Sequence, residues 1–252
     1  MNYKLISCEV FHREMCAAVA VSPHQVDIEF LPKALHDLGG EAMRAHLQEA
    51  VDRVDASRYA AILFGYGLCN NGLHGIVTRK LPLVAPRAHD CMTLFFGSKE
   101  RYLAYFRAHP GTFFKTSGWI ERDRADRPLK QLGNPNVMGP GHSYAELVER
   151  YGEDNAQYIH ETLCRQSPHY TQVTFIEMGV EPDDRFENQA RETARDRQWG
   201  FDKVRGDRNM FTQLVGGDWP DHVFLVVPPG HRIAAAYDDG IIRAEACEAG
   251  VG

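Results

Sequence analysis

The 252-residue chain has 44% hydrophobic and 25% charged residues, which is typical of a globular protein with a sizeable core. Its formal net charge of −6 argues against a general nucleic-acid-binding protein, and no apolar run approaches the roughly 20 residues of a membrane span. Because the N-terminus is too charged for a signal peptide, we expect a cytoplasmic protein whose six cysteines stay reduced.

Strand and helix patterns alternate along the first half of the chain. Apolar residues recur every three or four positions at 40–54, as in an amphipathic helix, and the fully apolar AAILF at 60–64 is typical of a strand inside a parallel sheet. In chain order we expect a strand at 3–10, a helix at 12–21, a strand at 26–32, a helix at 40–54, strands at 60–64 and 81–86, a helix at 98–109, and a strand with a turn at 111–119.

The second half begins with a polar stretch rich in proline and glycine, which we expect to form an irregular connection or lid. The elements predicted after it are helices at 143–151 and 155–166, a strand at 171–179, a helix at 185–199, a short strand at 201–207, a helix at 208–217, and a strand at 222–233 stopped by two prolines.

The alternation of strands and helices predicts an α/β fold with a mainly parallel open sheet and flanking helices. The polar stretch can separate two Rossmann-like lobes. The expected organisation is an N-terminal α/β lobe at 1–121 that carries the cysteine loops, a connection or lid at 122–141, a C-terminal α/β lobe at 142–240 and a loose tail at 241–252.

Three cysteines fall at the ends of three predicted strands. Cys8 ends the first strand, Cys69 lies in GYGLCNNGLHG directly after 60–64, and Cys91 follows 81–86. Ligands of open parallel sheets bind outside the carboxyl ends of the strands, so these thiols can converge on one site. The glycines around Cys69 would let the backbone approach a bound group closely.

Three thiolates with room for a fourth ligand suit zinc with an open coordination position, or a 4Fe–4S cluster with one iron not held by cysteine. The sequence therefore predicts Cys8, Cys69 and Cys91 as metal ligands. The alternative is that each cysteine only fills space in the core, since cysteine is often buried and none of the spacings is a compact metal motif. We interpret the other cysteines, Cys16, Cys164 and Cys247, as structural or incidental.

Polar residues beside these cysteines are candidates for catalysis and substrate binding. Glu9 and Asp90 could act as acid or base, and His89 adds a nitrogen donor two residues before Cys91. The candidate substrate-binding residues are Tyr66, Asn70, His74, Lys115 and Trp119. Asparagines in CNNG are also ordinary turn residues. Neither GYG nor GLHG matches a phosphate loop or a dinucleotide fingerprint, so neither ATP nor NAD is predicted.

Four segments, CEVFHRE, GYGLCNNG, PRAHDC followed by GS, and GTFFKTSGW, resemble the family catalogued as domain of unknown function 1638. The resemblance covers most of the chain and is most specific in its N-terminal half. Members often accompany corrinoid-dependent methyl-transfer systems, so the resemblance implies a one-carbon setting with a corrinoid protein or methyltransferase as partner. The pair His89 and Cys91 is also similar to the His-x-Cys zinc ligands of methyltransferases related to uroporphyrinogen decarboxylase, whose later cysteine has no clear counterpart here.

The predicted function is that of a metal-dependent enzyme acting on a small molecule, by methyl- or sulfur-group transfer. Two alternatives stay open: an iron–sulfur lyase or desulfurase that uses the same cysteines, and a non-enzymatic carrier or accessory protein for a metal, a corrinoid or another cofactor.

Overall fold

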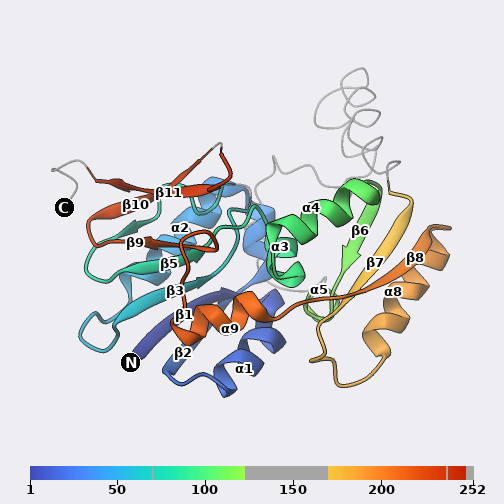
Figure 1. Ribbon diagram of the computed structural model, residues 1–252, viewed down its shortest axis with the longest axis horizontal. Helices are drawn as coiled ribbons and strands as arrows, with labels where there is room; N and C mark the ends of the chain where they lie inside the picture. Colours follow the sequence, from blue (N-terminus) through green and yellow to red (C-terminus); the bar gives the residue numbers. More distant parts are fainter. Residues whose placement is uncertain (70, 123–169, 237, 248–252) are drawn as a thin grey trace, which may run out of the picture.

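The structure is a computed structural model that describes residues 1–69, 71–122, 170–236 and 238–247 (Figure 1). The helices predicted at 143–151 and 155–166 lie outside the described residues, as do Asn70, Cys164 and all of the expected lid except Arg122.

The largest sheet has five strands in the order β2-β1-β3-β5-β9 (Figure 1). The first four are parallel and β9 is antiparallel to β5. This confirms the predicted α/β fold with a mainly parallel sheet and flanking helices. The strands are β1 (Asn2–Cys8), β2 (Gln25–Leu31), β3 (Ala61–Gly65), β5 (Leu83–Pro86) and β9 (Phe224–Val227).

Helices cover both faces of this sheet because strand side chains alternate between them. Leu5 and Leu63 belong to the cluster that includes α1 (His12–Ala20) and α9 (Asn209–Gly216). Their neighbours Ile6 and Ile62 pack in a second cluster with α2 (Gly40–Asp52). The fully apolar strands in the sequence are therefore explained by burial from two sides.

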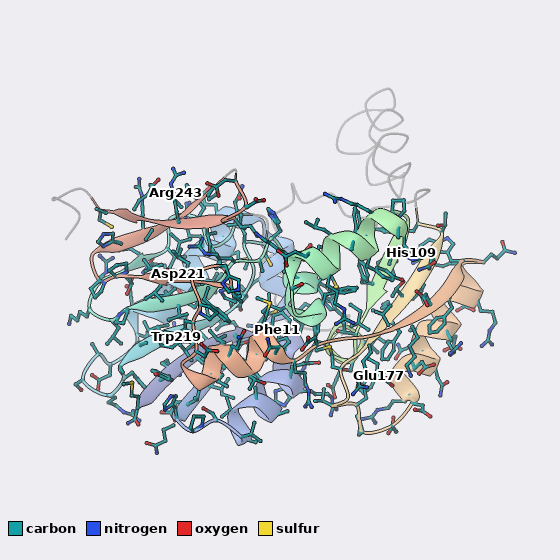
Figure 2. All side chains as sticks on the ribbon, in the orientation of Figure 1. Phe11, His109, Glu177, Trp219, Asp221 and Arg243 are labelled. Carbon is teal, nitrogen blue, oxygen red and sulfur yellow. The ribbon has the colours of Figure 1, made fainter. Side chains whose placement is uncertain are left out.

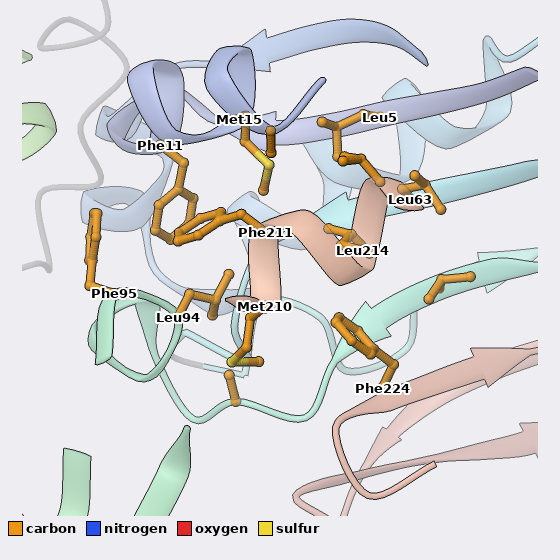
Figure 3. Close-up of a cluster of buried hydrophobic side chains, with 14 of the residues drawn as sticks. Leu5, Phe11, Met15, Leu63, Leu94, Phe95, Met210, Phe211, Leu214 and Phe224 are labelled. Carbon is orange, nitrogen blue, oxygen red and sulfur yellow. The ribbon is translucent and has the colours of Figure 1, made fainter. Parts of the chain in front are cut away.

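The first cluster packs together the segments next to Cys8 and Cys91, two of the predicted metal ligands (Figure 3). The ring of Phe11 lies 4.9 Å from that of Phe95 and 5.2 Å from that of Phe211, measured between centroids. These rings join the short helix η1 (Glu9–Phe11), α3 (Cys91–Phe96) and α9. Phe11 lies at the junction of the first and second sheets (Figure 2).

The second sheet is parallel, with the order β6-β7-β8. Its strands and helices are β6 (Thr112–Lys115), β7 (Gln172–Glu177), β8 (Gly200–Arg205), α4 (Lys99–Ala108), α5 (Ser117–Glu121) and α8 (Arg185–Asp196). Helix α5 attaches this sheet to the first one. A Cβ on Gly118 would lie 1.7 Å from the carbonyl oxygen of Val10, so only glycine permits this approach. Arg13 completes the attachment with two hydrogen bonds to Glu121, of 3.0 and 2.7 Å.

A third, antiparallel sheet corrects two expectations about the C-terminal part. It contains β4 (Val77–Thr78), β10 (His231–Ala235) and β11 (Ile242–Ala246) in the order β11-β10-β4. The single strand predicted at 222–233 is wrong, because Pro228 lacks an N–H and Gly230, with φ of +77°, reverses the chain between β9 and β10. The tail is not loose at 242–246, where β11 pairs with β10.

The expected C-terminal lobe at 142–240 is divided between two sheets. Strands β7 and β8 form the second sheet with β6, whereas β9 joins the first sheet and α9 packs on α1 against it. In the part of the chain that the structure describes, no helix is both long and apolar enough to cross a membrane.

One ionisable side chain, that of Glu14, lies inside the first core without a hydrogen-bond partner among the described residues. Glu14 on α1 is 0% exposed, and neither of its carboxyl oxygens has a hydrogen bond to another described residue. Burial raises the pKa of Glu14 to about 8, from an ordinary value of 4.5. The side chain is therefore mostly protonated at pH 7 in the folded protein.

Glu14 should make the protein less stable as pH rises from 4.5 to 8, because over this window the unfolded chain releases a proton that the folded chain keeps. Glu14→Gln removes this titration. We expect the free energy of unfolding of the variant minus that of the wild type to be larger at pH 8 than at pH 5 by more than about 2 kcal/mol, which means that the variant gains relative stability. Urea unfolding at both pH values measures the difference. The same difference for the exposed control Glu192→Gln should be near zero, and an equal value for both variants would contradict the account.

Candidate functional site

The three predicted cysteines line one small cavity at the carboxyl edge of the first sheet. Cys8 ends β1, Cys69 lies in the loop after β3, and Cys91 opens α3 after β5. These strands are neighbours in the parallel sheet, so their ends meet at one edge. The cavity has a volume of about 20 Å³, and its lining residues are Cys8, Val10, Phe11, Pro32, Lys33, Leu35, Met43, Tyr66, Gly67, Cys69, Cys91 and Trp119.

Backbone hydrogen bonds hold the loop of Cys69 against the segment that leads to Cys91. The N–H of Leu68 donates to the carbonyl oxygen of Ala88 at 2.8 Å, and the N–H of Cys69 donates to that of His89 at 2.9 Å. The two loops therefore continue the pairing of β3 and β5 beyond the ends of the strands, and bring the two cysteines together.

Glycine is required in this loop because the backbones approach so closely. A Cβ on Gly67 would lie 2.8 Å from the carbonyl carbon of Asp90, which leaves no room for a side chain. Cys69 itself has a positive φ of 36°, a conformation that is unfavourable for a residue with a side chain. Such a conformation persists where the surrounding structure imposes it, and it is often found at functional sites.

The cavity keeps its thiols protonated. Burial raises the pKa of Cys8 and of Cys69 to about 12, and raises that of Cys91 well above its usual value. The thiols also raise one another's pKa, because two thiolates this close would repel. Cys8 and Cys91 are only half-buried when the whole residue is considered. Desolvation of the thiol is nevertheless the largest cause of the raised pKa for both.

Tyr66 leaves a hydroxyl group in the cavity without a partner. The residue is 3% exposed, and its oxygen makes no hydrogen bond to any described residue. Burial is the main cause that raises its pKa, followed by the charges that Cys8 and Cys69 would carry. Buried polar groups are nearly always hydrogen-bonded. The unpartnered hydroxyl therefore marks a position where a bound group would find a donor.

Charged and aromatic residues close one side of the cavity. The Lys33 ammonium lies 4.7 Å from the centroid of the Trp119 ring, and a hydrogen bond from the Trp119 side chain lowers the pKa of Cys91. Glu9, only 7% exposed, accepts a 3.0 Å hydrogen bond from the N–H of Lys33 and lies 3.6 Å from the guanidinium of Arg122. Glu9 thus anchors this wall without lining the cavity.

The other candidate residues lie away from the cavity lining. Asp90 caps α3, accepting from the N–H of Thr93 at 3.2 Å and from the Tyr102 hydroxyl at 3.1 Å. His89 is exposed, and His74 accepts a hydrogen bond from the N–H of Ala235. The ammonium of Lys115 lies 5.2 Å from the centroid of the Phe113 ring. Of the predicted residues that the structure describes, those that line the cavity are Cys8, Tyr66, Cys69, Cys91 and Trp119.

Sequence reasoning missed the contribution of the segment after β2. Pro32, Lys33 and Leu35 line the cavity, and β2 lies next to β1 at the edge of the same sheet. The signal was present in the sequence, because a predicted strand ends at Pro32 and the strand-end argument applies to it as well.

The cysteines are not arranged as a finished metal site. Within the described ranges, no group of three histidine, cysteine, aspartate or glutamate side chains could hold a metal ion in its present conformation. The three cysteines line one cavity without forming a set of metal ligands.

A family model described as protein of unknown function (DUF1638) matches residues 30–215, which is well over half of the chain. The chain belongs to this family. The matched range contains Cys69 and Cys91 but begins after Cys8. No match was found among curated proteins, and none among solved structures.

Burial should make the cavity thiols far less reactive than Cys16, which is exposed on α1. Only the thiolate is alkylated, and raised pKa values remove it. In metal-free folded protein at pH 8, we expect iodoacetamide to modify Cys16 more than about tenfold faster than Cys69. Mass spectrometry of the peptides measures both rates. In urea the two rates should become similar, and equal rates in the folded protein would contradict the described burial.

Proposed function

We propose that the protein is a metal-dependent enzyme that acts on a small molecule at the three-cysteine cavity. The observation that carries the proposal is the convergence of Cys8, Cys69 and Cys91, from three neighbouring strand ends, on one cavity. Thiolates are good ligands for zinc, and catalytic zinc sites keep one position open beside three protein ligands.

The cavity favours a single ion over a cluster. Its volume of about 20 Å³ has room for one water-sized group, whereas a 4Fe–4S cluster would require the walls to separate. The present side-chain conformations do not form a ligand set. Each cysteine has one side-chain torsion with staggered positions, so a change of rotamer is the smallest movement by which the thiols could approach a common ligand.

The protonation of the thiols determines when a metal can bind. Ligation requires thiolates, so binding must release protons from groups whose pKa is raised by burial. The same low-polarity surroundings strengthen the attraction between a bound cation and the thiolates. Affinity for the metal should therefore increase with pH.

Zinc bound here would act as a Lewis acid that activates a thiol or water at the open position. The residues of the chain would bind and orient the substrate. The Tyr66 hydroxyl can donate a hydrogen bond to the bound group, Trp119 forms a wall, and Lys33 brings positive charge to the same cavity. Methyl- or sulfur-group transfer suits this arrangement, with a corrinoid protein or methyltransferase as the proposed partner.

A second candidate is a carrier that holds a metal ion or delivers a cofactor. The small volume of the cavity suits it, because about 20 Å³ accommodates an ion, whereas binding of an organic substrate would require the cavity to widen. Turnover of a small molecule by the isolated chain would distinguish the enzyme from the carrier.

Protein purified without oxygen and without a metal-affinity column should contain about one zinc ion per chain and be colourless. Cys8→Ser, Cys69→Ser and Cys91→Ser should each lose most of the metal, and the control Cys16→Ser should keep it. Elemental analysis and the visible spectrum measure these outcomes together. Iron with a brown colour would indicate the cluster enzyme instead, and metal retained in all three cavity variants would overturn the proposed site.

A further inference from the structure

A second cavity lies at the carboxyl edge of the second sheet. Its volume of about 700 Å³ is within the range of small-molecule sites. Met178 and Gly179 follow the end of β7, and Gly206 and Asp207 follow the end of β8. Glu177, labelled in Figure 2, is the last residue of β7 and marks this edge. In parallel sheets ligands bind at such edges, so the position is that of a binding site.

This cavity is positively charged in a protein whose net charge is −6. Arg101, Arg205 and Arg208 all line it. The Arg101 guanidinium is fixed by hydrogen bonds to the carbonyl oxygens of Phe96, at 3.2 Å, and of Arg205. The guanidinium groups of Arg205 and Arg208 make no hydrogen bond or ion pair with any residue that the structure describes, so both are available to an anion.

The one carboxylate among the lining residues is already engaged. Asp207 accepts a 2.8 Å hydrogen bond from the backbone N–H of Asn209, at the start of α9. Helix α9 begins at the cavity, and the N-terminus of a helix carries a partial positive charge. The N-terminus of α9 therefore adds to the positive electrostatic potential that the arginines create in the cavity.

Apolar side chains complete the wall. Ala18 lies on α1, Val21 directly follows that helix, and Met178 follows β7. Val21 is 73% exposed. The cavity therefore has a positively charged part, lined by the three arginines, and an apolar part, lined by these three side chains.

We propose that this cavity binds an organic phosphate. The phosphate group would be held by Arg205 and Arg208, since a phosphate monoester carries nearly two negative charges and guanidinium groups bind it through paired hydrogen bonds. The organic part would lie against Ala18, Val21 and Met178. Arg205 is the last residue of β8 and Arg208 directly precedes α9, whereas Arg101 comes from α4.

This second site is independent of the proposed metal function. The two cavities share no lining residue, and the phosphate site involves no cysteine. Loss of metal binding would therefore leave the phosphate proposal intact, and the reverse also holds.

Isothermal titration with AMP and with glucose 6-phosphate tests the proposal and distinguishes a nucleotide from a sugar phosphate. At least one should bind, and adenosine or glucose should not. Arg205→Gln and Arg208→Gln should each raise the Kd about tenfold or more. The control Arg195→Gln removes the same charge from the exposed side of α8, away from the cavity, and should leave the Kd unchanged.

The proposal is overturned if neither phosphate binds the wild-type protein at millimolar concentration, or if the unphosphorylated compounds bind equally well. It is also overturned if both cavity variants keep the wild-type affinity. Circular dichroism of each variant checks that the fold is intact.

Discussion

Two backbone hydrogen bonds, from Leu68 to Ala88 and from Cys69 to His89, determine the geometry on which the candidate site depends. They extend the pairing of β3 and β5 past the ends of both strands, and they require a glycine at position 67. Parallel pairing of β1 with β3 then brings Cys8 to the same edge. The cavity is thus assembled by main-chain pairing.

The second sheet closes the cavity that the first sheet opens. Helix α5 carries Trp119 to the cavity, and the close contact of Gly118 with Val10 leaves no room for a side chain at position 118. Enclosure has an electrostatic consequence, because it desolvates Cys8, Cys69 and Cys91 together and keeps them neutral. A bound cation would favour the thiolates instead, and this is the basis of the proposed metal site.

Much of this arrangement follows from sequence patterns. Apolar runs predicted the buried strands, and the position of each cysteine after a strand predicted the shared cavity. Other features did not follow. The reversal at Gly230 and the pairing of β11 depend on contacts with β4 and β10 that no local pattern reveals. A turn was expected where helix α5 lies. Its five residues form a helix because of the Thr116 cap and the packing on η1, and the packing is not visible in the local sequence. Lys33 follows a predicted strand, so its place at the sheet edge was signalled in the sequence. The arginines of the second cavity lie on α4 and at the end of β8 or just after it, and no local pattern reveals that these segments meet.

The central claim is that the three cysteines bind one metal ion, and X-ray absorption at the zinc edge tests it most directly. Protein loaded with one equivalent of zinc should show about three sulfur neighbours at about 2.3 Å and one lighter neighbour at about 2.0 Å. Cys69→Ser should lose sulfur from this shell. A shell of only nitrogen and oxygen atoms, or one unchanged in that variant, would contradict the account and leave three buried thiols without a common ligand.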